Sequence, residues 1–165
     1  MTERDEVDRI VESWQMVRPD LDFAPLMVLS RVKRLARHLE RARKTAFATA
    51  ELESWEFDVL AALRRSGPPF ELSPKNIGQQ TLVSSGTMTN RIDRLARRAL
   101  VERRGDPNDG RGVLVRLTSD GEARVDAAIE ELLRAEAELL EGLGRADQER
   151  VAKLLRKLSG AFDGG

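Results

Sequence analysis

Apolar side chains recur at three- and four-residue spacings along most of the chain, which predicts a mainly helical protein. The first such segment runs from about Glu3 to Arg18. Pro25 opens a longer helix with one apolar stripe and an opposite face of arginine and lysine. Ser54 has the position of an N-cap residue for a third helix, which Gly67–Pro69 ends.

A short fourth helix is expected to begin at Ser73 and Pro74, because serine caps a helix and proline suits the first helical position. Residues 82–86, which end in Ser84, Ser85 and Gly86, then predict a turn, followed by a fifth helix from about Ser85 to Arg98. The apolar face of this fifth helix comprises Met88, Ile92, Leu95 and Ala99.

Two short strands are predicted next, at residues 100–104 and 113–117. Residues 105–112 between them are turn-forming, so we expect a hairpin with an eight-residue tip. Thr118 caps the next helix, and a last helix extends to about Phe162. A hairpin directly after a helix-turn-helix predicts a winged helix, mainly α with a small β-hairpin wing (α+β).

The composition removes several kinds of chemistry. The chain has no cysteine and one histidine, His38, so disulfides and cysteine nucleophiles are excluded and zinc sites or histidine triads are disfavoured. His38 stands among arginines, where a solvated helix face explains it better than a pH switch. No glycine-rich phosphate loop or nucleophile motif occurs, and we therefore expect no enzyme activity, no metal and no cofactor.

The length of 165 residues suits one domain with helical extensions. No apolar run reaches the roughly 18 residues of a membrane span. Residues 1–12 are charged and lack a signal-peptide pattern. We therefore expect a cytoplasmic protein.

Charge is unevenly distributed although the net charge is zero. Residues 30–44 hold seven lysines and arginines against one glutamate, and residues 84–104 hold six arginines against two acids. Residues 1–22 and 118–150 are acidic. One face could therefore meet a polyanion, although alternating solvated helices would explain the same pattern.

A second face of the fifth helix carries side chains that read DNA. Arginine binds guanine and asparagine binds adenine through paired hydrogen bonds, and threonine offers a hydroxyl and a methyl group. The small turn before the helix would let its N-terminus approach a phosphate. A solvated arginine-rich helix is the alternative, but the preceding turn and the following hairpin favour DNA binding. The predicted DNA-binding residues are Ser84, Ser85, Thr87, Thr89, Asn90, Arg91, Arg94, Arg98, Asp109 and Arg111.

The predicted wing supplies the last two of these residues. Arg111 lies at the tip, two residues after Asp109. The carboxylate of Asp109 could hold the guanidinium for insertion into a minor groove, whose negative potential attracts it. Alternatively, Asp109 serves only the turn, through a hydrogen bond to the backbone.

The sequence resembles the multiple-antibiotic-resistance-regulator (MarR) family across residues 54–60, 85–95 and 106–118, within a match of about residues 25–162. This resemblance implies a homodimer that places recognition helices in major grooves, and wings in minor grooves, of a near-palindromic operator. It also implies repression that a small, aromatic or anionic effector relieves. On this basis residues 1–52 are N-terminal helices for dimerisation and effector binding, 53–118 the DNA-binding domain, and 119–165 the C-terminal dimerisation helices.

A narrower similarity is to the urate-responsive subgroup, in which a tryptophan, an aspartate and an arginine contribute to the effector pocket. The matching residues are Trp14, Asp58 and Arg91. The alternative is structural: Trp14 anchors the extra helix and Asp58 pairs locally. A further polar residue of that pocket has no match here, so urate and other small anions both remain open.

Two other functions fit parts of the pattern. A protein-interaction module could use a winged helix, although a charged recognition helix argues against it. A different winged-helix family would change the effector and leave the DNA contacts as they are.

Overall fold

The computed structural model describes residues 4–160, which its contacts divide into two compact units, 4–43 and 44–160. The first unit holds α1 (Glu6–Val17) and most of α2 (Ala24–Thr49), and the second unit begins within the last turns of α2. No helix of the described residues is long and apolar enough to cross a membrane. The predicted division at residues 52/53 and 118/119 separates DNA binding from dimerisation and effector binding, and it stays a prediction.

The first unit pairs two helices through apolar and charged contacts. Asp5 caps α1 by accepting a hydrogen bond from the backbone N–H of Asp8 at 3.0 Å. Val7 and Val11 are the buried residues of α1. The predicted first helix is confirmed, with Glu6 as its first described helical residue.

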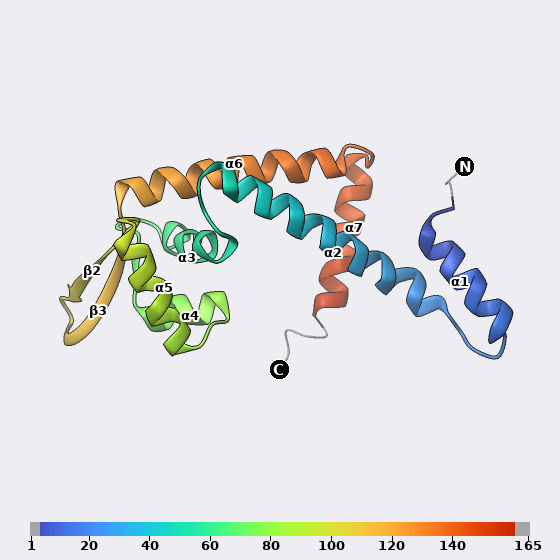
Figure 1. The fold of residues 1–165 in the computed structure, drawn as a ribbon, viewed down its shortest axis with the longest axis horizontal. Coiled ribbons are helices and arrows are strands. Elements are labelled where there is room, and N and C mark those ends of the chain that lie inside the picture. Colours follow the sequence, from blue (N-terminus) through green and yellow to red (C-terminus); the bar gives the residue numbers. More distant parts are fainter. Residues whose placement is uncertain (1–3, 161–165) are drawn as a thin grey trace. The chain divides into compact units, whose positions relative to one another are not determined.

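The second unit is mostly helical with a small antiparallel sheet, as predicted (Figure 1). The strands lie in the order β1-β3-β2. Helix α3 packs against α4 and α6, and α4 packs against α5. The elements after α2 are α3 (Ser54–Arg65), β1 (Glu71–Leu72), α4 (Pro74–Thr81), α5 (Ser85–Arg97), β2 (Val101–Asp106), β3 (Asp109–Leu117), α6 (Ser119–Leu140) and α7 (Arg145–Ser159).

One apolar core holds the second unit together. The rings of Phe47 and Phe57 stack with centroids 4.1 Å apart, joining the end of α2 to α3. Leu60, Ile77 and Ile92 bring α3, α4 and α5 into the same cluster and are fully buried. Each such side chain contributes roughly 1.5–3 kcal/mol on burial. The core therefore fixes α5 on the scaffold through its apolar face.

The wing differs from the prediction in the length of its strands. Strands β2 and β3 continue to Asp106 and Asp109, so two residues, Pro107 and Asn108, form the tip in place of eight. The turn-forming residues are compatible with pairing because the register shifts between Gly105 and Asp106, as in a β-bulge. Asp106 also accepts a hydrogen bond from the N–H of Asn108 at 2.8 Å.

The short strand β1 was missed, because two residues carry no periodic signal. It pairs with β3, with Glu71 opposite Arg116. The side chains of this pair approach to 3.6 Å as well. The sheet thus ties the segment before α4 to the base of the wing.

The structure corrects two of the predictions about helix ends and confirms two predicted N-caps. The N-cap of α3 is Glu53, so Ser54 is its first helical residue, and the prediction that Ser54 is the cap is wrong. Ala99 lies beyond α5 with φ 55° and is exposed, so it is no part of the apolar face. Ser73 and Thr118 cap α4 and α6 as predicted. The predicted end of the last helix at Phe162 lies outside the described residues.

Candidate nucleic-acid interface

Helix α5 is held so that one face is buried and the rest faces outward. Met88, Ile92 and Leu95 are at most 1% exposed. Leu82 has φ 54° and ends α4 in the left-handed conformation, which turns the chain into α5. The sequence therefore builds a helix-turn-helix in which the polar face of α5 remains accessible. We call this face the polar ridge; it comprises Thr87, Asn90, Arg91, Arg94 and Arg98.

The N-terminus of α5 has no side-chain cap. Ser84 is the cap residue, but its hydroxyl bonds the hydroxyl of Thr87 at 3.1 Å and makes no hydrogen bond to a helix N–H. The predicted residues Ser84, Ser85 and Thr87 are exposed around this end. The first-turn N–H groups and the helix dipole therefore favour an anion such as a phosphate.

The middle of the ridge carries the predicted amide and guanidinium groups. Asn90 and Arg94 are exposed and Arg91 is half-buried. Thr89 is exposed but its hydroxyl donates to the carbonyl of Ser85 at 3.1 Å. Asn90, Arg91 and Arg94 are thus the long polar side chains that this face offers to base edges and phosphates.

Trp55, which was not predicted from the sequence to be part of the site, lies beside these arginines. The guanidinium carbon of Arg94 lies 4.7 Å from the ring centroid of Trp55, and that of Arg91 lies 5.4 Å away. Trp55 comes from the first turn of α3 and packs against the core. A tryptophan at that place has the pattern of an ordinary amphipathic residue, and only the packing of α3 against α5 brings it under the ridge.

Arg98 is placed differently from the other arginines predicted to bind DNA. Its Nη1 donates to Glu56 at 2.5 Å, and its Nη2 donates to the carbonyl of Glu51 at 2.8 Å. Glu56 is 2% exposed. A buried carboxylate needs such a partner, so the guanidinium of Arg98 stabilises the fold at the C-terminal end of α5.

Two arginines of the wing, Arg111 and Arg103, have different surroundings. Arg111 is exposed, and its backbone N–H donates to Asp109 at 3.0 Å. This is the turn-forming bond that was the alternative to a carboxylate–guanidinium pair. Arg103 of β2, which was not singled out in the sequence, forms a 2.7 Å ion pair with Asp93 of α5. An ion pair therefore connects the wing to α5.

The residues predicted to bind an effector fall in both units. Asp58 is exposed on α3 and Arg91 is on α5, both in the second unit. Trp14 belongs to the first unit, is 49% exposed and stacks on Phe23 with centroids 6.1 Å apart. Their roles in effector binding stay predictions.

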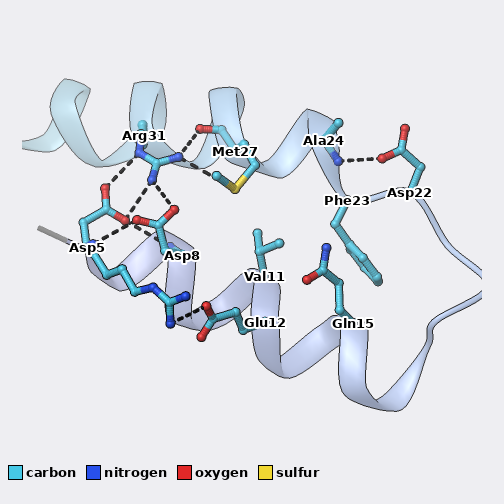
Figure 2. Close-up of a pocket in the computed structure, with 11 residues that line it drawn as sticks. Asp5, Asp8, Val11, Glu12, Gln15, Asp22, Phe23, Ala24, Met27 and Arg31 are labelled. Carbon is cyan, nitrogen blue, oxygen red and sulfur yellow. Dashed lines mark hydrogen bonds and ion pairs between the residues drawn. The ribbon is translucent and has the colours of Figure 1, made fainter. Parts of the chain in front are cut away.

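A cavity of about 700 Å³ lies between α1 and the start of α2 within the first unit (Figure 2). Arg31 points into a pair of carboxylates there, at 2.8 Å from Asp5 and 2.8 Å from Asp8. The backbone N–H of Asp8, and then Arg31, lower the pKa of Asp5. Since four carboxylates and two guanidiniums line this cavity, its charge disfavours an anionic ligand. The described residues also contain no group of three or more His, Cys, Asp or Glu able to hold a metal.

Comparison with known proteins identifies relatives over nearly the whole chain. A model of the MarR family matches residues 51–112. PecS of Dickeya dadantii, an HTH-type transcriptional regulator, is 33% identical over 153 residues, covering 93% of this chain and 92% of PecS. BpsR of Bordetella bronchiseptica, whose DNA binding is regulated by 6-hydroxynicotinic acid, is 31% identical with a TM-score of 0.60, covering 78% of this chain and 98% of BpsR. A cysteine-to-serine mutant of E. coli MarR in complex with operator DNA is 26% identical with a TM-score of 0.68, covering 84% of this chain and 99% of that chain.

Proposed function

Because this chain belongs to the MarR family of DNA-binding transcriptional regulators, we propose that it represses transcription from a near-palindromic operator as a homodimer, and that a small anionic or aromatic effector releases it. Family membership also supports the expectation that the chain is not an enzyme. The observation that carries the proposal is the exposed ridge of α5 beginning at an uncapped helix N-terminus. A repressor that occupies chromosomal DNA would act in the cytoplasm.

The proposed DNA contacts are of three kinds: base edges in the major groove, a backbone phosphate and the minor groove. Asn90 and Arg94 would reach base edges in the major groove, and the N-terminus of α5 would bind a phosphate. Arg111 would enter the adjacent minor groove from the wing. In a dimer, the two recognition helices must be roughly 34 Å apart to meet successive major grooves.

The proposed homodimer is supported by apolar rows that the single chain leaves exposed. Contiguous exposed apolar surface is unusual in a monomer and marks an interaction site. Such residues lie on three helices outside the DNA-binding core: Val28, Leu29, Val32 and Leu35 on α2; Ile129, Leu133, Leu139 and Leu140 on α6; and Val151, Leu154, Leu155 and Leu158 on α7. Sedimentation equilibrium should give twice the chain mass, and a monomer at micromolar concentration would contradict the proposal.

The proposed effector acts through Arg91, which lies on the DNA-facing ridge. A guanidinium binds a carboxylate through two hydrogen bonds, so a small anion and DNA would compete for it. Asp58 is the second proposed effector residue of this unit, and Trp14 is the proposed effector residue of the first unit. A ligand releases DNA only through its different affinities for the two states of the protein. The regulation of BpsR by 6-hydroxynicotinic acid supports a flat anionic ligand.

A gel-shift titration with the DNA upstream of the protein's own gene tests the operator part of the proposal. The wild type should shift this DNA, and Arg94→Ala should lose about tenfold or more in affinity together with sequence preference, because a bidentate base contact is worth about 1–3 kcal/mol. A mutated operator is the matched control. Equal binding to both DNAs would contradict sequence-specific regulation.

The effector part is tested by titrating urate, salicylate and 6-hydroxynicotinate into the preformed complex. At least one should release DNA from the wild type. Trp14→Phe and Asp58→Asn should each raise the concentration required. No release by any of the three anions would contradict the proposed effector class.

A further inference from the structure

Trp55 forms a platform under two arginines of the DNA-facing ridge. Its ring centroid lies 4.7 Å from the guanidinium carbon of Arg94 and 5.4 Å from that of Arg91. Both distances fall within the range of cation–π attraction. Because Trp55 packs against the core, the platform cannot rotate freely.

A carboxylate completes the cluster. The indole Nε1–H of Trp55 donates to Glu53, the cap residue of α3. The other oxygen of Glu53 lies 3.5 Å from Nη2 of Arg94. Both partners of this ion pair are about half-exposed, at 60% for Glu53 and 49% for Arg94. Water screens such a pair, so an approaching anion can displace the carboxylate at little cost.

We propose that Trp55 is a positioning residue for DNA binding, and that Glu53 is the internal counter-ion that a DNA phosphate displaces from Arg94. The inference rests on the proposed DNA-binding function. Stacking uses the face of a guanidinium and leaves its in-plane N–H donors for phosphates and base edges. The indole therefore removes side-chain freedom from Arg91 and Arg94 before binding, and DNA binding loses less entropy.

The surroundings of the cluster agree with this role. A hollow of about 380 Å³ is lined by Trp55, Arg91 and Arg94 together with Gly86, Thr87 and Asn90. Apart from Trp55, these residues belong to the uncapped N-terminus of α5 and to the polar ridge. The indole thus lies beside the surface that would meet DNA. There it also orders Arg91 and Arg94, two of the side chains that would bind DNA.

Two substitutions of Trp55 distinguish the effect of its aromatic ring face from the effect of its apolar volume. Trp55→Leu keeps apolar volume against the core and should weaken operator binding by about tenfold, whereas Trp55→Phe keeps a π-face and should stay within about threefold of the wild type. Urea unfolding at one protein concentration checks that both variants remain folded. Equal operator affinity for Trp55→Leu and the wild type would overturn the proposal.

A double-mutant cycle distinguishes positioning from a general loss of structure. In an Arg94→Ala background, Trp55→Leu should cost less than about threefold, because the nearer of the two arginines is gone and only Arg91 remains over the ring. Arg97→Ala is the matched control, since Arg97 is exposed on the same helix and bonds only its own helix carbonyl among the described contacts. In that background the loss from Trp55→Leu should remain about tenfold. Equal losses in both backgrounds would overturn the proposal.

Substitution of Glu53 tests the counter-ion. Glu53→Gln keeps an acceptor for the indole N–H but removes the charge, so operator binding should tighten by about two- to threefold at low salt and converge with the wild type at high salt. Weaker binding by this variant would overturn the counter-ion role.

A measurement without DNA separates failure of this inference from failure of the proposed function. The Nε–H NMR resonances of Arg91 and Arg94 should lie under the ring current of Trp55 and shift in Trp55→Leu, while that of Arg97 stays in place. If the resonances do not move, the cluster is absent in solution and the inference is overturned while operator binding stands. If they move but the wild type binds no operator, the proposed function fails, and positioning for DNA fails with it.

Discussion

The close approach of α6 to the start of β2 predicts that Gly121→Ala destabilises the protein. Gly121 lies in the first turn of α6, and a Cβ built there would be 2.1 Å from the carbonyl oxygen of Leu100. Carbon–oxygen contacts are ordinarily about 3.3–3.6 Å, so the backbone must separate by about 1 Å. The same oxygen accepts a hydrogen bond from the N–H of Thr118 at 3.2 Å, which this displacement would break.

The expected loss follows from three opposing contributions. Overpacking a rigid site costs about 1–3 kcal/mol. Leaving the Leu100 carbonyl without its partner costs about 1–3 kcal/mol. Alanine in a helix returns about 1 kcal/mol relative to glycine. The free energy of unfolding should therefore fall by about 3 kcal/mol, a large share of the roughly 5–15 kcal/mol typical of a native protein.

Urea unfolding of the wild type and of Gly121→Ala, followed by circular dichroism at one protein concentration, measures this difference. Gly86→Ala is the matched control, because Gly86 also lies in the first turn of a helix but has nothing within 4 Å of its built Cβ. The control should unfold within about 1 kcal/mol of the wild type. It should nevertheless bind operator more weakly, since a methyl group at the N-terminus of α5 keeps a phosphate away.

A loss below about 1 kcal/mol for Gly121→Ala would refute the reasoning, because overpacking and the lost hydrogen bond together should exceed the gain in helix propensity by at least that amount. Such a result would mean that α6 can move away from Leu100 without breaking the Thr118 contact. Destabilisation by Gly86→Ala to the same degree would refute it as well, since glycine loss in any first helical turn would then explain both variants.

Three further predictions concern charged groups. Arg98→Ala should lower the free energy of unfolding by about 3 kcal/mol, because it leaves buried Glu56 without its ion-pair partner, and Glu56→Gln in the same chain should restore part of the loss in urea titrations. Arg111→Ala should leave thermal unfolding unchanged but reduce the slope of log affinity against log salt by about 0.9, and an unchanged slope would show that Arg111 makes no phosphate contact. Arg64 lowers the pKa of the Asp126 carboxyl, so this pair stabilises the fold above the ordinary aspartate pKa of about 3.9 and loses its effect as pH falls below it. Acid unfolding of Asp126→Asn should accordingly show a smaller pH dependence in that range, and identical acid profiles would contradict it.

Much of the fold and of the candidate site could be predicted from local patterns. The apolar spacing of Met88, Ile92 and Leu95 predicted both the buried face of α5 and, by difference, the exposed ridge. Ser73 and Thr118 were predicted as caps because capping depends on residues within one helical turn. The family resemblance on the same segments led to the regulator class that the relatives confirm.

The rest depended on residues far apart in the chain. Arg98 has the same spacing as the other ridge arginines, yet its partner Glu56 lies 42 positions away, and only packing of α3 against α5 brings them together. The same packing places Trp55 under Arg94.

Sequence by itself determined which segments become helices, that a hairpin follows α5, and which face of α5 is polar, because periodicity and capping act over a few residues. Tertiary structure decided what each guanidinium on that face does. The partner of a long charged side chain is chosen by burial and proximity, and these arise only when distant segments pack together. Arg98 accordingly stabilises the fold through buried Glu56, while the guanidiniums of Arg91 and Arg94 lie over the ring of Trp55.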